Sequence, residues 1–223
     1  MDYEIISTGS NGNAVVINKS VLVDCGVTFK QLRSIYKGLK LVLLTHIHSD
    51  HFNKATIKKL ANERPMLRWG CCSWLVEPLV LAGVTKSQID VLEPNNLYGY
   101  GICNVIPVKL YHNVPNCGYK LHFQVGKVIY ATDTNHLTGV QAKHYDLYMI
   151  EANHCEVEIR EKIKNKKAEG LYAYEVHAAR NHLSIQKANE FIYSNAGPKS
   201  EYVYLHCHKD KEGSINDNDS QNC

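Results

Sequence analysis

The sequence is poor in arginine, in long apolar runs and in regularly spaced cysteines. Only five of its 25 basic residues are arginine, so the bidentate forks that suit phosphate recognition are scarce. No eighteen apolar residues run together, and the start "MDYEIISTGSNGN" lacks the features of a signal peptide. The eight cysteines include no CxxC and form no regular framework. We therefore expect a soluble cytoplasmic protein with free thiols and no membrane segment.

The composition indicates one globular domain. With 223 residues, of which 44% are hydrophobic, the chain can bury a substantial core. We expect a single domain over residues 1–210 and a polar, disordered tail over 211–223. The formal net charge of +3 neither demands nor excludes an anionic partner.

Short strands and helices alternate along the chain, which indicates an α/β fold. Strand patterns cover residues 3–8, 13–18, 20–26, 40–45, 101–112, 118–126, 127–133, 145–154 and 201–208. Helical patterns cover residues 28–39, with Thr28 as N-cap, and 53–63, 72–83, 155–170 and 184–197, the last closed by Gly197. Two groups of strands with helices around them predict two sheets packed face to face and covered by helices.

Four ionisable side chains follow the apolar run "LVLLT" within six residues: His46, His48, Asp50 and His51. Imidazole and carboxylate ligands suit zinc and similar divalent ions, and this spacing is too tight for one tetrahedral ion to use all four. Two ions that share a water fit better. The alternative is a set of surface histidines at a helix start, with Asp50 or Asn53 as N-cap.

A site for two metal ions needs further ligands and a bridging carboxylate. Candidates close later strands: His112 ends "VIPVKLYH", Asp133 ends "KVIYATD" and His206 ends "EYVYLH". One such histidine alone would be a weak signal, but the three share the same kind of position.

These motifs resemble the metallo-β-lactamase fold superfamily, whose members are αββα four-layer sandwiches of two mixed β-sheets. "THIHSDH" is similar to its HxHxDH signature, and His112, Asp133 and His206 match the later motifs in order. The segments "TGSNGN", "VLVDCG", "YATDTNHL", "IEANH" and "NHLS" are similar to the YycJ/WalJ-like branch. "IEANH" and "NHLS" also resemble the RNase Z-type phosphodiesterases. The resemblance covers residues 3–208.

The resemblance implies a ligand set and catalytic roles. One ion would be held by His46, His48 and His112, and the other by Asp50, His51 and His206, with Asp133 as the bridge. Asp50 would also orient the bridging hydroxide. His182 would be the general acid and Glu151 its orienting partner.

Three positions depart from the family pattern. Asn181 stands where glycine usually precedes the HLS histidine, and Asn113 replaces an aspartate after the third-motif histidine. After His206 the sequence "CHKD" replaces the usual "LS", so the neighbouring His208 is a rival for the last ligand.

The function predicted from these residues is dinuclear, metal-dependent phosphodiester hydrolysis. Two divalent ions, Zn²⁺ or Mn²⁺, about 3.5–4 Å apart would activate a shared hydroxide. The leading substrate class is DNA or RNA, cleaved by an exonuclease-like activity. A small cyclic nucleotide is the alternative, because the chain shows no insertion that would form an arm over a polynucleotide. Thioester or lactam hydrolysis and a non-catalytic binding module are less favoured, and a homodimer would help to wall an open groove.

Other conspicuous residues have plainer interpretations. We expect hydrogen-bonded or exposed side chains rather than ligands at His122 and His136. Contact of His154 with the substrate is the less favoured interpretation of that residue. "GSNGN" lacks the following helix of a phosphate-binding loop, so we interpret it as a turn beneath the metal loop. Cys71 and Cys72 are expected to be ordinary thiols.

Overall fold

Two six-stranded sheets form the centre of the protein, in a computed structural model that describes residues 1–207. The first sheet contains, in spatial order, β1 (Tyr3–Ser7), β2 (Ala14–Ile17), β3 (Val21–Val23), β4 (Leu41–Leu44), β5 (Arg68–Cys71) and β6 (Ile89–Val91). The second contains β7 (Tyr98–Gly99), β8 (Asn104–Tyr111), β9 (Pro115–Phe123), β10 (Gly126–Ala131), β11 (Leu147–Glu151) and β12 (Glu201–Leu205). Each sheet starts antiparallel and ends with parallel strands, so both are mixed, as expected.

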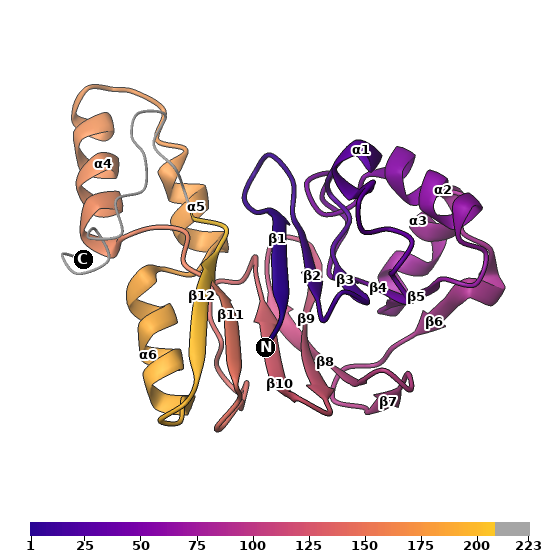
Figure 1. The fold of residues 1–223 in the computed structure, drawn as a ribbon. Helices are drawn as coiled ribbons and strands as arrows, with labels where there is room; N and C mark the ends of the chain where they lie inside the picture. Colours follow the sequence, from indigo (N-terminus) through magenta and orange to yellow (C-terminus); the bar gives the residue numbers. More distant parts are fainter. Residues whose placement is uncertain (208–223) are drawn as a thin grey trace.

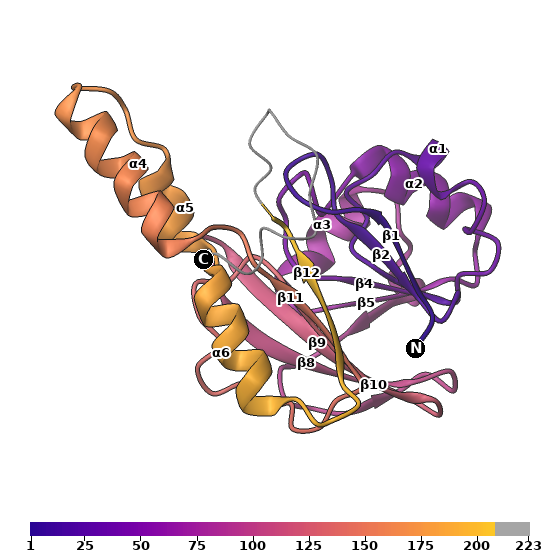
Figure 2. The ribbon, with the colours of Figure 1, turned by 60° about the vertical axis from the view of Figure 1, so that its left-hand side comes forward.

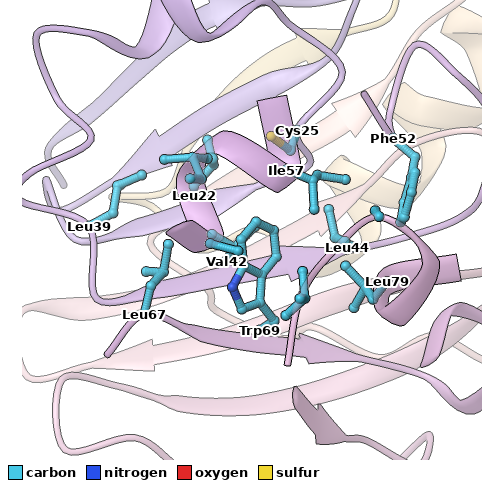
Figure 3. Close-up of a cluster of buried hydrophobic side chains, with 14 of the residues drawn as sticks. Leu22, Cys25, Leu39, Val42, Leu44, Phe52, Ile57, Leu67, Trp69 and Leu79 are labelled. Carbon is cyan, nitrogen blue, oxygen red and sulfur yellow. The ribbon is translucent and has the colours of Figure 1, made fainter. Parts of the chain in front are cut away.

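Three apolar layers hold the sheets and helices together. Leu41 and Leu43 of β4 pack between the two sheets, against residues such as Tyr119 of the second sheet. Val42 and Leu44 point to the opposite face and meet the helices, as Figure 3 shows around the buried Trp69. Because β4 is covered on both faces, its sequence is continuously apolar rather than alternating. A third cluster packs the second sheet against the last helix. The four-layer αββα architecture expected from the resemblance is confirmed (Figure 1).

Helices α1 (Phe29–Leu32), α2 (Lys54–Glu63) and α3 (Val76–Leu81) cover the first sheet, with short 3₁₀ turns at Ser73–Leu75 and Lys86–Gln88. Thr28 caps α1, as the sequence predicts, through a reciprocal pair with Gln31. The helix is only one turn long, although a helix to residue 39 was expected. After α1 the chain is irregular. Arg64, which directly follows α2, donates hydrogen bonds to the carbonyl oxygens of Tyr36 and Leu39 in this irregular segment.

Helix α6 (Ile185–Asn195) covers the second sheet and begins at the predicted cap, where the Ser184 hydroxyl accepts from the Lys187 amide. It ends at Asn195, and the next residue, Ala196, is extended. Gly197 therefore does not close the helix in a left-handed conformation. A Cβ there would lie 2.9 Å from His144 Nδ1, so glycine serves a close approach to a side chain instead.

Helices α4 (Glu156–Ala168) and α5 (Glu175–Asn181) form a hairpin that projects away from the second sheet (Figures 1 and 2). The sequence predicts no insertion that would form a long arm or cap over a polynucleotide, but the structure shows that this short hairpin does project from the body. The sequence predicted α4, but α5 was missed because it is short and buries only one residue, Glu175.

No helix among residues 1–207 is long and apolar enough to cross a membrane. The predicted tail 211–223 and His208 lie outside the described residues.

Candidate metal centre

All of the predicted site residues meet at one edge of the two sheets, where several strands end. His46 to His51 follow β4, His112 follows β8, Asp133 follows β10, Glu151 ends β11 and His206 follows β12. β8, β10, β11 and β12 run in the same direction, so their carboxyl ends lie together. The structure thus brings together the seven predicted ligands, together with Glu151 and His182.

His46, His48 and His112 form a group of three converging imidazoles. The Nδ1 atom of His48 lies 3.1 Å from His46 Nε2 and 3.3 Å from His112 Nε2. Two nitrogen ligands of a tetrahedral zinc ion, each about 2.05 Å from the metal, would be about 3.3 Å apart. The group therefore has the spacing that one divalent ion requires.

Two hydrogen bonds orient rings of this group. The Thr45 hydroxyl lies 2.9 Å from His46 Nδ1, and the carbonyl of Asn181 accepts from His112 Nδ1 at 3.0 Å. Burial, followed by the positive charge of neighbouring His51, lowers the pKa of His46 to about 2. Burial also lowers the pKa of His112. Both imidazoles are consequently neutral, which is the form that binds metal.

Asp50, His51 and His206 form a second group. Asp50 Oδ2 lies 3.5 Å from His51 Nε2 and 4.0 Å from His206 Nε2. Asp133 lies between the two groups: its Oδ2 is 2.9 Å from His51 Nε2, and its Oδ1 is 3.9 Å from His112 Nε2. The same Oδ1 also lies 3.6 Å from His206 Nδ1. Asp133 therefore borders both groups.

Asp24 is a buried residue of the site that sequence reasoning did not identify. It accepts hydrogen bonds from His51 Nδ1 at 2.7 Å, from the Thr45 amide at 3.0 Å and from the Thr45 hydroxyl at 2.9 Å. Burial alone would lower the pKa of His51, but Asp24 and Asp133 together raise it well above the usual value. The available signal was an aspartate that ends the buried strand "VLVD".

Glu151 and His182 form a tight pair beside the second group. Glu151 Oε1 lies 2.6 Å from His182 Nδ1 and 2.9 Å from His206 Nδ1, while its Oε2 accepts from the amides of Thr134 and Leu183. Burial would raise the pKa of Glu151, but the hydrogen bonds from His182 and His206 outweigh it and lower the pKa. Glu151 is therefore an anion that orients two imidazoles at once.

The loop "GSNGN" lies beneath the metal loop, as the sequence predicts. The Asn13 amide nitrogen donates to the Asp50 carbonyl at 2.6 Å, and its side-chain nitrogen lies 2.8 Å from His51 Nε2. The backbone of Gly26 packs directly against the backbone of Asp50, since a Cβ on Gly26 would lie 1.7 Å from the Asp50 carbonyl oxygen. The position of Asp50 thus depends on a glycine.

The residues with plainer interpretations lie outside the metal groups. His122 Nε2 is 2.7 Å from the Tyr145 hydroxyl, and His136 stacks on Tyr111. His154 is half-buried and pairs through its backbone with Ser184. The thiols of Cys71 and Cys72 are buried and form no disulfide.

Comparison with known proteins agrees with this geometry. The family model described as "Beta-lactamase superfamily domain" matches residues 19–192, so the chain belongs to this superfamily. Among curated proteins, exodeoxyribonuclease YycJ of Bacillus anthracis is 23% identical over 176 residues. That match covers 69% of the chain and 63% of the relative, so it spans less than two thirds of the relative's length.

Two solved structures share the fold over nearly the whole chain. The metallo-β-lactamase fold protein YhfI from Bacillus subtilis superimposes with a TM-score of 0.69 at 16% identity, covering 92% of this chain and 85% of YhfI. The short form of human tRNase Z gives 0.66 at 17% identity, covering 93% and 92%. The donor set of histidine and aspartate, in this fold, suits divalent metal ions.

Proposed function

We propose that the protein is a dinuclear metal-dependent phosphodiester hydrolase, and specifically a nuclease that acts on DNA or RNA. The observation that carries the proposal is the adjacency of two ligand groups, with Asp133 between them, to the Glu151–His182 pair. His46, His48 and His112 would hold one ion, and Asp50, His51 and His206 the other. When bound, two divalent ions would lower the pKa of a shared water and stabilise the oxygens of an in-line displacement.

Asp50 is suited to orient the attacking water. Its side chain is 24% exposed, whereas those of His51 and Asp133 are 0% and 3% exposed. Asp50 therefore borders the open side of the site, where it can accept a hydrogen bond from water as well as bind metal.

His182 is suited to protonate the leaving oxygen. Its side chain is 18% exposed, while its partner Glu151 is fully buried, so only the histidine of the pair can touch a substrate. Because Glu151 holds Nδ1, the atom left to deliver a proton is Nε2. Glu151 thereby fixes the orientation of the His182 ring.

The name of the YycJ relative, an exodeoxyribonuclease, and that of tRNase Z support a polynucleotide substrate. A small cyclic nucleotide is the second candidate, because the net charge of +3 is modest for a nucleic-acid enzyme. Both candidates use the same chemistry.

The first test is metal analysis followed by hydrolysis of bis-p-nitrophenyl phosphate. We expect two ions per chain, turnover by the native protein and loss of turnover in Asp50→Ala. His182→Ala should retain its metal and lose turnover on substrates with a poor leaving group, while His122→Ala, a matched histidine outside the site, should behave as the native protein. A protein that binds no metal and hydrolyses nothing would contradict the proposal and favour a binding module.

The substrate class is tested with labelled single- and double-stranded DNA, RNA and cyclic nucleotides, with added Mn²⁺ or Zn²⁺. Cleavage of a polynucleotide supports the nuclease, whereas cleavage of cyclic nucleotides alone supports the second candidate.

A further inference from the structure

The hairpin of α4 and α5 offers a surface that packing does not use. Of the thirteen residues of α4 only Ile159 is buried, and the hairpin extends beyond the body of the protein (Figure 2). A helix that buries a single side chain contributes little to a core. Most of its side chains therefore face solvent.

The far end of this hairpin, residues 162–174, which we call the arm tip, combines lysines with exposed tyrosines. Four lysines lie between residues 162 and 167 without an acidic neighbour among them, and Lys164 and Lys167 are exposed. Tyr172 and Tyr174 are 76% and 48% exposed, and the Lys166 ammonium lies 4.3 Å from the centre of the Tyr174 ring.

The acidic residues of the hairpin neutralise part of this charge, since the buried Glu175 is bonded to Lys166. Glu156 and Glu158 lie towards the base of the hairpin, and Glu161 directly precedes the arm tip. Within the arm tip only Glu169 is acidic.

We propose that the arm tip binds a single-stranded segment of a polynucleotide whose scissile bond lies at the metal centre. Lysines that attract the backbone and aromatic rings on which bases stack are the combination used for single strands. This inference rests on the proposed function and adds to it a site that holds the substrate at a distance from the reaction.

The base of the hairpin is fixed to the metal centre, which connects the two sites. At its end, the Asn181 carbonyl accepts from His112 Nδ1 at 3.0 Å, and His182 follows directly. At its start, the Glu156 carboxylate accepts from the Ser184 hydroxyl at 2.9 Å. A strand held by the arm tip is thus held at a fixed distance from His182.

The length of α4 sets the number of nucleotides needed. Its thirteen residues span about 20 Å at 1.5 Å per residue. A stacked strand that advances 3.4 Å per nucleotide covers that distance in about six nucleotides. The affinity of the protein for three-nucleotide strands should therefore not depend on the arm tip, whereas its affinity for twelve-nucleotide strands should.

The test compares Lys164→Glu/Lys167→Glu and Tyr172→Ala with the native protein. Lys37→Glu/Lys40→Glu is a matched control, because these two lysines are exposed, have the same spacing and lie before β4, away from the site. Binding of labelled twelve-nucleotide DNA and RNA is measured by fluorescence anisotropy without divalent metal and at several salt concentrations. Hydrolysis of bis-p-nitrophenyl phosphate is measured in parallel.

We expect Kd for the twelve-nucleotide strands to rise at least fivefold in both arm variants and to stay unchanged in the control. The slope of log Kd against the logarithm of the salt concentration should fall by about 1.4 in the double lysine variant. The reason is that each lysine that neutralises a phosphate of a single strand releases about 0.7 counterion. Hydrolysis of bis-p-nitrophenyl phosphate should be unaffected in all of them.

Equal affinity in the arm variants and the native protein would overturn the inference and leave the arm tip to a protein partner. Failure of the proposed function has a different signature, since bis-p-nitrophenyl phosphate would then not be hydrolysed even by the native protein, while the anisotropy would still report on the arm tip.

Discussion

Replacement of Asp24 by asparagine should weaken the second metal site while leaving the fold intact. Asp24 is buried and accepts from two fixed donors, the Thr45 amide and His51 Nδ1. It has a φ of +60°, which asparagine also tolerates. The asparagine oxygen must stay with the backbone amide, which cannot change, so its NH₂ group would face His51 Nδ1.

In the metal-free native protein both ring nitrogens of His51 carry a proton, because Asp24 and Asp133 raise its pKa. Facing the new donor, His51 must give up its Nδ1 proton and keep the one on Nε2, which lies 2.9 Å from Asp133 Oδ2 and can donate to it. Metal binding, however, needs a bare Nε2. Loss of a partner that orients a histidine ligand costs about 10- to 100-fold in metal affinity, or about 1.4–2.7 kcal/mol.

Isothermal titration calorimetry with Mn²⁺ or Zn²⁺ measures this effect. The second ion should bind about 10- to 100-fold more weakly to Asp24→Asn, the first ion should bind as before, and the thermal midpoint of the metal-free protein should change little. Asp90→Asn, which removes an acid bonded to Arg68 away from the site, is the control. Equal affinity for the second ion in Asp24→Asn and the native protein would refute this role of Asp24.

Two further predictions follow from the site. Gly26→Ala should destabilise the protein by more than about 3 kcal/mol and abolish metal binding, because the new Cβ would collide with the Asp50 carbonyl. Chemical denaturation measures the loss of stability. The control, Gly99→Ala, should change the free energy of unfolding only slightly, because its Cβ meets only a side-chain atom at 3.4 Å. Metal uptake should release protons and tighten as pH rises, because the pKa values of His51 and His206 are raised in the metal-free protein, so both must lose a proton before binding. Calorimetry in buffers of different ionisation enthalpy measures this release, and a pH-independent affinity would contradict it.

Much of the fold could be predicted because the signals are local. The caps Thr28 and Asn53 and the apolar run before His46 are each set by neighbours in the sequence. The strand Arg68–Cys71 was missed because it is only four residues long and contains Gly70, which is required by the close packing of Leu43. Such a strand exists only through its neighbours in the sheet.

The ligand cluster was predictable from motif order, whereas its supports were not. Asp24 acts through Thr45 and His51, which lie 21 and 27 residues further along the chain. The contact between Asn181 and His112 spans 69 residues and uses a backbone carbonyl, which no side-chain pattern reveals. Partners of this kind are set by the packing of strands and helices.

The most direct test of the account is a crystal structure of the protein soaked in Mn²⁺, with anomalous diffraction to locate the ions. The account predicts two peaks about 3.5–4 Å apart. One should lie among His46, His48 and His112, and the other among Asp50, His51 and His206, with Asp133 between them. A single peak, or peaks away from these residues, would contradict the dinuclear centre on which the proposed function depends.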